Sequence, residues 1–283
     1  MPAENESVED LTASRTVVVT GASSGIGLAA AEELARRGHQ VALVGRDKDR
    51  LDTALSLVRQ AASGPAPAAF QADFAVLDEV RALAERLAAA YPRIDVLANN
   101  AGALIPRRVT TVDGFEATIQ TNHLASFLLT HLLRERLVGG RVVNTSSQLH
   151  RGLLDPDDLS LARRRYLPLL MYASSKQANI LFTAEAARRW PDTLSTAFAP
   201  GTVRTRFGND SWSIGPFFRV AFWLRTPAKG AETLVWLAEA PAGELVNGGY
   251  YADRRLRRAR SQATDPALAA RLWDASLAAV GLT

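Results

Sequence analysis

Short runs of β-branched residues alternate along this chain with longer segments in which Ala, Leu and Arg recur at helical spacing. Strands are expected near residues 15–20, 40–45, 68–72, 94–99, 140–146 and 194–199. Helices are expected over residues 26–37, 50–60, 77–89, 115–133 and 172–189, and a last helix follows residue 264. Because strands that alternate with helices form parallel sheets, the pattern predicts an α/β fold of three layers (αβα), a doubly wound parallel sheet between two layers of helices.

The chain has 283 residues, of which 47% are hydrophobic and 22% charged, and this suits one globular domain with a sizeable core. We expect that single domain over residues 14–283, after a disordered polar tail at residues 1–13. Residues 149–171 and 202–226 interrupt the alternation, and long loops of this kind often cover a binding site. The acidic N-terminus and the lack of a long apolar run predict no signal peptide and no membrane span, so a cytoplasmic location is expected.

Composition excludes several functional classes. The chain has no Cys, which rules out a disulfide scaffold, a thiolate metal site and a cysteine nucleophile. Its four His are scattered, so no metal site is expected. The formal net charge is +4, and no aromatic residues interleave the Arg-rich run at residues 254–260. We interpret that run as solvated surface or subunit contact and expect no nucleic-acid partner.

Residues 20–27 follow the first strand, read TGASSGIG and lead directly into a helix. Glycines at such a turn let backbone N–H groups approach a pyrophosphate, and the helix that follows directs the positive end of its dipole at the phosphate charge. A glycine-rich turn can also serve close packing alone. We favour a dinucleotide site.

Tyr172 and Lys176 are four residues apart, which places a phenol and an amine on one face of a helix. An ammonium in that position can stabilise a phenolate and so lower the pKa of a tyrosine that exchanges a proton. Ser147 ends the strand near residues 140–146, at the sheet edge where open α/β folds bind ligands. Each residue also has an ordinary interpretation, because Tyr172 and Lys176 could lie on the surface and Ser147 could cap a turn.

Together with the sequence NNAG at residues 99–102 and with Asn122, these motifs resemble the short-chain dehydrogenase/reductase family, in the family's order and on the expected elements. The resemblance extends over about residues 14–250 and implies a Rossmann fold and hydride transfer between a nicotinamide cofactor and a carbonyl or alcohol. It implies that Tyr172 is the general acid/base, that Ser147 binds the substrate oxygen, and that Asn122 positions a water. Lys176 is then the residue that stabilises the phenolate and holds the cofactor ribose. The cofactor site that it implies consists of Gly21, Ser23, Ser24, Gly25, Ile26, Gly27, Arg46, Asp73, Phe74, Asn99, Ala101, Gly102, Tyr172, Lys176, Pro200, Gly201, Val203 and Thr205.

The choice of cofactor depends on the end of the second strand. It reads Val44, Gly45, Arg46, with no carboxylate where NAD enzymes usually bind the ribose 2′-hydroxyl. A guanidinium there can pair with a 2′-phosphate, so Arg46 favours NADP(H) over NAD(H). Asp47 follows directly and could oppose this preference, or it could cap the next helix and leave Arg46 merely exposed.

Within the family, the segment 121–130, the interval of 25 residues between Ser147 and Tyr172, and the pair Leu272 and Trp273 are most similar to the retinol-dehydrogenase-like subgroup. That subgroup acts on lipophilic carbonyls and alcohols. The resemblance therefore implies reduction of a ketone or aldehyde, or the reverse oxidation, on a lipophilic and natural-product-like substrate. The candidate substrate contacts are Leu149, Leu153, Phe207, Trp212 and Phe217.

Alternative functions keep the same fold. The chain could be an NADP-dependent epimerase, an enone or quinone reductase, or a non-catalytic NADP-binding sensor. The presence of Ser147, Tyr172 and Lys176 together favours an enzyme. In many members of the family, the helices that correspond to residues 115–133 and 172–189 form a four-helix interface, so a homodimer or homotetramer is expected.

Overall fold

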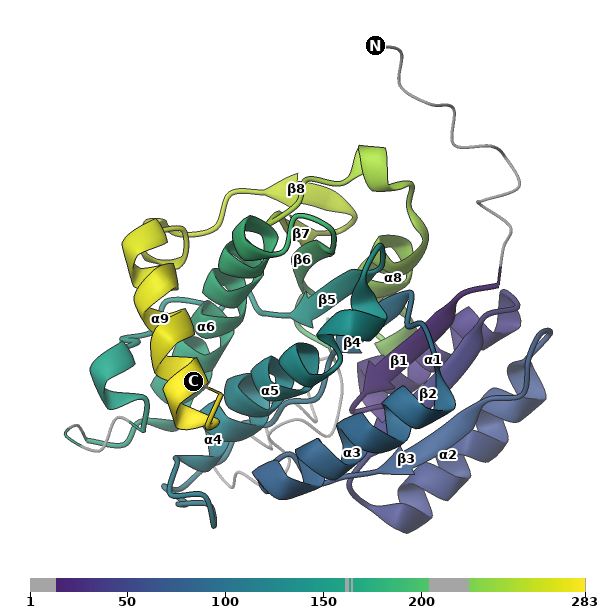
Figure 1. The fold of residues 1–283 in the computed structure, drawn as a ribbon, viewed down its shortest axis with the longest axis horizontal. Coiled ribbons are helices and arrows are strands. Elements are labelled where there is room, and N and C mark those ends of the chain that lie inside the picture. The colour runs from purple at the N-terminus through teal and green to yellow at the C-terminus, as the bar shows by residue number, and fades with distance from the viewer. Residues whose placement is uncertain (1–13, 161–162, 164, 204–223, 283) are drawn as a thin grey trace.

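The computed structural model describes residues 14–160, 163, 165–203 and 224–282. Within this part of the chain, eight strands form one sheet in the order β3-β2-β1-β4-β5-β6-β7-β8, and only β8 runs antiparallel to its neighbour (Figure 1). The strands are β1 (Thr16–Thr20), β2 (Gln40–Gly45), β3 (Ala68–Gln71), β4 (Val96–Asn99), β5 (Arg141–Thr145), β6 (Leu194–Ala199), β7 (Tyr250–Ala252) and β8 (Arg255–Arg257). The chain winds from β1 out to β3 and returns to β4 on the other side of β1, so the predicted doubly wound sheet is confirmed. Open sheets of this kind bind ligands where the winding reverses, at the carboxyl ends of β1 and β4.

Helices cover both faces of the sheet (Figure 1). They are α1 (Gly25–Arg36), α2 (Lys48–Ala61), α3 (Leu77–Ala90), α4 (Ala117–Ile119), α5 (Ala125–Leu132), α6 (Pro168–Arg189), α8 (Pro227–Glu239) and α9 (Pro266–Ala279). Buried residues of α1, α2 and α8, such as Leu34 and Leu234, form one apolar core with the strands. Buried residues of α3, α5 and α6, such as Leu83 and Phe127, form a second core. Burial on both faces explains why the strands are apolar along their whole length.

The six predicted strands are confirmed as β1 to β6, with ends within two residues of the expected positions. The predicted helix at residues 115–133 is confirmed from Ala117 to Leu132, but a π-helical turn over Gln120–Leu124 lies within it, between α4 and α5. Such turns often occur at functional sites, and this one contains Asn122. Helix α6 begins at Pro168 rather than at residue 172, because the fixed φ angle of proline suits the first turn of a helix. The predicted loop at 149–171 therefore ends four residues earlier than expected.

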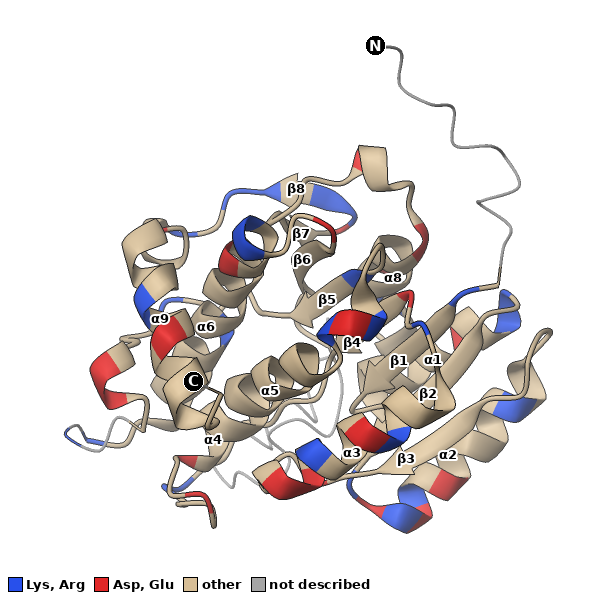
Figure 2. Ribbon diagram, in the orientation of Figure 1, with Lys and Arg blue, Asp and Glu red and all other residues tan. Residues whose placement is uncertain are grey.

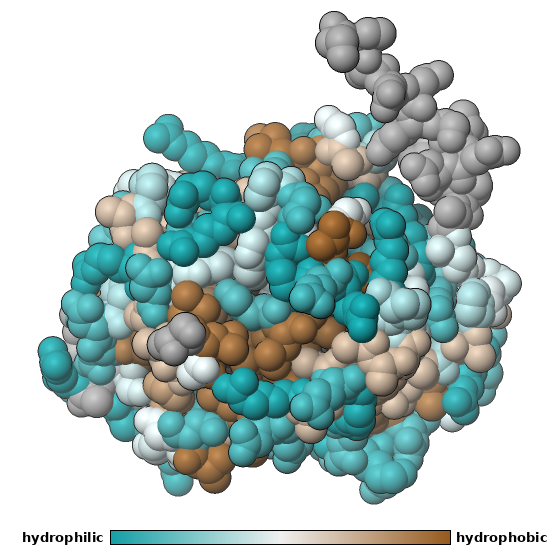
Figure 3. All heavy atoms as spheres, in the orientation of Figure 1, coloured by the Kyte–Doolittle hydropathy of each residue, from teal (hydrophilic) through white to brown (hydrophobic). Residues whose placement is uncertain are grey.

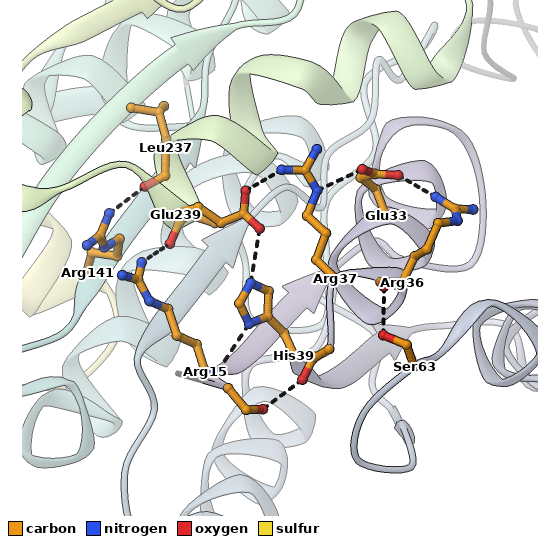
Figure 4. Close-up of polar contacts among 12 residues, drawn as sticks. Arg15, Glu33, Arg36, Arg37, His39, Ser63, Arg141, Leu237 and Glu239 are labelled. Atoms are coloured by element: carbon orange, nitrogen blue, oxygen red, sulfur yellow. Dashed lines mark hydrogen bonds and ion pairs between the residues drawn. The ribbon is translucent and has the colours of Figure 1, made fainter. Parts of the chain in front are cut away.

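A network of polar side chains joins β1, β5, α1 and α8 at the amino ends of the strands, opposite the ligand edge (Figure 4). Arg15 donates to the Ala238 carbonyl at 2.6 Å, and buried Arg141 donates to the carbonyls of residues 237 and 240 at 2.9 and 2.8 Å. Glu239 accepts from Arg37 at 2.7 Å and contacts the His39 ring at 3.1 Å. The guanidinium groups satisfy carbonyls that the end of α8 would otherwise leave without partners, so this edge of the sheet is structural.

The last helix, α9, packs along α6 on the outer side of the second core (Figure 1). Trp273, 4% exposed, contacts four aromatic rings at centroid distances of 4.9 to 5.9 Å, namely Phe127, His131, Phe182 and Trp190. These rings belong to α5 and α6 or directly follow α6, which are the helices expected to form a subunit interface. Helix α9 of the same chain covers that face. An oligomer of this chain would therefore have to use a different face of the subunit.

Candidate active site

The glycine-rich turn between β1 and α1 has the shape that a pyrophosphate requires. Gly21 and Gly25 have φ angles of +67° and +59°, which side chains rarely adopt. A Cβ atom on Gly27 would lie 2.3 Å from the Gly21 carbonyl oxygen, so only glycine allows this approach of helix to turn. Among the described residues, the first turn of α1 has no acidic residue and Ser24 makes no side-chain cap. The first N–H groups of α1 therefore stay available for an anion, which fits the predicted dinucleotide site.

The end of β4 lies directly beside this turn. Thr20 Oγ1 accepts hydrogen bonds from the backbone N–H groups of Asn100 and Ala101, both at 2.9 Å. The Asn100 side chain donates to the Thr20 carbonyl at 3.0 Å. Asn99, which the sequence predicted for the cofactor site, is 2% exposed and donates instead to Thr130 and Asn144 inside the protein. Asn100 is thus the side chain of the pair that supports the cofactor turn.

Arg46 and Asp73 lie together just beyond the carboxyl ends of β2 and β3. The Arg46 Nη1 atom is 3.7 Å from Asp73 Oδ2, and their side chains are 73% and 28% exposed. Asp47 accepts a hydrogen bond from the Arg50 N–H at 3.0 Å. It therefore caps α2, which was one of the two roles considered for it in the sequence. The Arg46 guanidinium is therefore accessible to a phosphate at this edge. Phe74 is 4% exposed and belongs to the core.

The structure brings Ser147, Tyr172 and Lys176 together from the end of β5 and the first half of α6. Tyr172 is 9% exposed and interacts with Ser147 by a side-chain hydrogen bond. Lys176 is 2% exposed, and its Nζ lies 5.6 Å from the centre of the Tyr172 ring. The Lys176 ammonium donates to the Thr145 carbonyl at 3.0 Å, which holds it at the end of β5. The predicted constellation is thus assembled in one place.

Burial sets the protonation states of the phenol and the amine. It raises the pKa of Tyr172 to about 12, while the hydrogen bond with Ser147 lowers it by less. Burial also lowers the pKa of Lys176 to about 8. Near pH 7, Tyr172 is therefore a neutral phenol and Lys176 is mostly an ammonium. In the chain by itself the phenol thus has a higher pKa than free tyrosine, and the lowering expected from Lys176 stays a prediction.

Asn122 holds the backbone around these residues. It lies in the π-helical turn, is fully buried, and both accepts from and donates to the backbone of Ala103, at 2.7 and 2.9 Å. Its amide also donates to Ser175 Oγ at 2.9 Å, and Ser175 Oγ donates to the Tyr172 carbonyl at 2.8 Å. A Cβ atom on Gly102 would lie 3.2 Å from both Asn122 Oδ1 and Lys176 Nζ, which shows how closely these groups converge.

Two residues that the sequence analysis missed position Ser147. His150 donates from Nδ1 to the Ser147 carbonyl at 2.7 Å, because its Nε2 accepts from the Arg260 N–H at 3.2 Å. The Tyr250 hydroxyl donates to the same carbonyl at 3.2 Å, and its ring lies edge-on to the His150 imidazole at 5.2 Å. Burial lowers the pKa of His150, so the ring keeps the neutral form that these two bonds require.

A third missed residue, Tyr166, joins the long loop before α6 to the loop after β4. Its hydroxyl donates to the Ile105 carbonyl at 2.7 Å and lies 3.2 Å from Glu116 Oε1. Arg108 covers the ring at 5.5 Å and donates to the Ser160 carbonyl at 3.3 Å. These contacts fix two loops that border the carboxyl edge of the sheet.

The remaining predicted residues are only partly placed. Leu149 and Leu153 are 51% and 50% exposed, and their contact with a substrate stays a prediction. A cavity of about 350 Å³ beside Leu153 lies between α6 and the start of α9 and is lined by neither Ser147 nor Tyr172. Pro200, Gly201 and Val203 follow β6, and Val203 packs against Gly230, which itself lies next to Ile26 of the cofactor turn. The predicted Thr205, Phe207, Trp212 and Phe217 lie outside the described residues.

Comparison with known proteins agrees with this geometry. Residues 15–213 match the short chain dehydrogenase family. The chain is 57% identical to a Streptomyces protein named "Putative daunorubicin C-13 ketoreductase", over 95% of this chain and 93% of the relative. It is 38% identical to human retinol dehydrogenase 14, over 95% of this chain and 87% of the relative.

Solved structures give the same result. A Mycobacterium paratuberculosis protein superposes with a TM-score of 0.77 at 33% identity, over 95% of this chain and 94% of that one. A short-chain dehydrogenase from Sphingobium yanoikuyae, solved in complex with NADPH, superposes with a TM-score of 0.63 at 28% identity, over 79% of this chain and 84% of that one.

Proposed function

The chain belongs to the short-chain dehydrogenase family, and we propose that it uses NADPH to reduce a ketone on a large, lipophilic, natural-product-like substrate. It is an oxidoreductase that acts on C=O and CH–OH groups. The observation that carries the proposal is the convergence of buried Tyr172 and Lys176 with Ser147 at the end of β5. The direction, reduction, is proposed from the relative that is named a ketoreductase.

A bound nicotinamide cofactor would supply the hydride, which the side chains themselves cannot provide. Ser147 Oγ is placed to donate a hydrogen bond to the substrate carbonyl oxygen. Tyr172 then transfers its proton to that oxygen, so that the carbonyl becomes an alcohol and the tyrosine a phenolate. The Lys176 ammonium, 5.6 Å from the ring centre, stabilises this phenolate by its positive charge. The water-positioning role expected of Asn122 stays a prediction, whereas its bonds to Ala103 and Ser175 hold the turn that carries Tyr172.

Separate observations support the finer choices of substrate and of cofactor. The relative at 57% identity is named as a ketoreductase of daunorubicin, a polycyclic ketone, and exposed Leu149 lies two residues from Ser147. For the cofactor, the accessible Arg46 guanidinium and the use of Asp47 as a helix cap favour a 2′-phosphate. The relative from Sphingobium yanoikuyae was solved with NADPH.

The test is the loss of absorbance at 340 nm when purified protein is mixed with NADPH or NADH and a panel of carbonyl compounds. The panel runs from small aldehydes through aromatic ketones to polycyclic ketones and quinones. We expect NADPH-dependent turnover that is fastest with polycyclic ketones and falls by at least about a thousandfold in Tyr172→Phe. Tyr91→Phe is the matched control, because it removes a phenol hydroxyl from a buried tyrosine in the core under α3.

Each alternative gives a different result. An epimerase converts its substrate without net NADPH consumption, and an enone or quinone reductase turns over those compounds but leaves saturated ketones unchanged. A sensor binds NADPH tightly with no turnover of any panel member. A rate that is equal in Tyr172→Phe and Tyr91→Phe would refute the proposed chemistry itself.

A further inference from the structure

Five arginines are clustered at the β8 edge of the sheet, where the ribbon in Figure 2 is coloured as basic along β8 and the segment that follows it. They are Arg254, Arg255, Arg257, Arg258 and Arg260, and we call them the arginine edge. All five are exposed, and none forms an ion pair with a carboxylate in the described part of the chain. Asp253, at the turn between β7 and β8, is paired with Arg225 instead. Asp253 also interacts electrostatically with Arg257, so the described chain offsets the charge of the arginine edge only in part.

The turn between β7 and β8, which carries the first of these arginines, has an unfavourable backbone conformation. Asp253 and Arg254 both have left-handed backbone conformations, with φ angles of 54° and 57°. Tight hairpins of this kind favour Gly or Asn at such positions, and Arg is disfavoured there. The hairpin directs Arg255 and Arg257 to one side of β8, because alternate residues of a strand share a side.

Aliphatic side chains accompany the arginines. Leu256 is 53% exposed, and its side chain lies beside Gly249. Val246, 51% exposed, lies three residues before Gly249 in the sequence. Figure 3 shows hydrophobic and hydrophilic residues side by side at the upper edge of the molecule, where Figure 1 labels β8. A cavity of about 380 Å³ opens at this place and is lined by apolar side chains of α6 together with Leu256, Arg257 and Arg258. The arginine edge therefore combines positive charge that is only partly offset, an exposed leucine and a partly apolar cavity.

We propose that the arginine edge is a peripheral docking surface for an anionic lipid bilayer. The guanidinium groups bind lipid phosphates, and the exposed Leu256 between them enters the interface between head groups and acyl chains. The cavity between Leu256 and α6 offers room for one glycerophosphate head group. Among the described residues, no helix is long and apolar enough to cross a membrane.

Other occupants suit this surface less well. Nucleic acids without base pairing bind to exposed aromatic rings, and none of the exposed large hydrophobic residues in the described chain is aromatic. A second copy would bring two sets of five arginines together, and like charges at a contact are strongly unfavourable.

The docking surface adjoins the active site. The backbone N–H of Arg260 donates to His150, and His150 in turn donates to the carbonyl of Ser147. The chain at the arginine edge is therefore two hydrogen bonds from the catalytic serine. A bilayer bound there would lie beside the edge of the sheet at which Ser147 and Tyr172 meet.

The test is co-sedimentation of the full chain with vesicles of pure phosphatidylcholine and with vesicles of equal parts phosphatidylcholine and phosphatidylglycerol. We expect binding to the anionic vesicles alone, weakened when salt is raised from about 0.05 to 0.5 M. The double variant Arg255→Ser/Arg257→Ser should lower the partition coefficient roughly 30-fold, since each basic residue near an anionic surface contributes about a fivefold change. The control Arg36→Ser/Arg59→Ser removes the same charge from the exposed surfaces of α1 and α2, away from β8, and should bind about as tightly as the wild type.

Three outcomes would overturn the proposal. The first is equal sedimentation with neutral and anionic vesicles at low salt. The second is an equal loss in the β8 variant and in the control variant, because binding would then follow net charge rather than the arginine edge. The third is binding to a short DNA duplex that is tighter than binding to anionic vesicles and is lost in the β8 variant, which would make this edge a nucleic-acid surface.

Discussion

Lowering the pH from 8 to 5 should destabilise the fold, because His123 is buried as a neutral ring next to Asn122 in the π-helical turn. Its side chain is fully buried, and burial lowers its pKa from 6.5 to about 4, although a hydrogen bond with Asn179 acts in the opposite direction. The ring nitrogen Nε2 lies 2.9 Å from Ser276 Oγ of α9. The unfolded chain takes up a proton on this histidine near pH 6.5, and the folded chain does so only near pH 4. The stability that His123 contributes is therefore complete above pH 6.5 and is lost as the pH falls toward 4.

The size of the effect follows from the two pKa values. At pH 5 the unfolded state gains about 2 kcal/mol relative to the folded state through His123 alone, and at pH 4 about 3 kcal/mol. A domain is stable by only about 5–15 kcal/mol, so this is a substantial part of the total. Burial also lowers the pKa of His131, to about 4, and that of His150, and both act in the same direction.

The assay is urea unfolding followed by tryptophan fluorescence at several pH values between 4 and 8. Between pH 6.5 and 4, His123→Gln should reduce the slope of unfolding free energy against pH by up to about 1.4 kcal/mol per pH unit. Ser276→Ala is the control, because it removes about 1 kcal/mol of hydrogen bonding but keeps the ionisable ring, so the slope should remain. If His123→Gln showed the wild-type slope, the reasoning about a neutral buried ring would be wrong.

Four further predictions concern the site and the assembly. The rate of ketone reduction should fall as the pH rises through about 8, because Lys176 then loses its charge; a rate that stays flat to pH 10 would contradict this. Arg46→Ser should raise the KM for NADPH about 10- to 100-fold and leave that for NADH nearly unchanged. Tyr166→Phe should raise the KM for a large ketone several-fold more than that for a small aldehyde, since it releases the loop contact with Ile105, and equal changes would show a merely structural role. Size-exclusion chromatography with light scattering should give a 30.5 kDa monomer, because α9 covers the expected interface; a stable dimer would show that another face is used.

The sequence predicted the parts of the site that local spacing determines. Tyr172 and Lys176 share a helix face by their spacing, and the glycines of the first turn are recognisable because few other residues fit there. Ser147 was predicted because parallel strands bring their carboxyl ends to one edge. These features depend on neighbours within a few positions and not on the rest of the fold.

The parts that were missed or wrong depend on contacts between distant segments. Tyr250 supports Ser147 across 103 positions of sequence, and the contact forms only because β7 joins the sheet beside β6. The burial that raises the pKa of Tyr172 in the chain by itself was missed too, because residue order does not reveal it, while the lowering expected from Lys176 stays a prediction. The sequence does not distinguish the roles of the adjacent Asn99 and Asn100. Only the strand geometry decides which of the two side chains is directed into the core. Helix α8 was also missed, although its start is indicated by Thr226, a capping residue, followed by Pro227, a first-turn proline.

The C-terminal region after β7 changes what the rest of the sheet can do. Helix α9 buries Trp273 against α5 and α6, and Ser276 of the same helix reaches His123, the neighbour of Asn122. Strand β8 pairs with β7 in the antiparallel direction, so the β7 edge is occupied too. A second copy would therefore have to displace α9 to reach the outer face of α5 and α6, or to meet five exposed arginines to reach β8. Within the chain itself, His150 holds the Ser147 carbonyl, Ser175 holds the Tyr172 carbonyl and the Thr145 carbonyl holds the Lys176 ammonium.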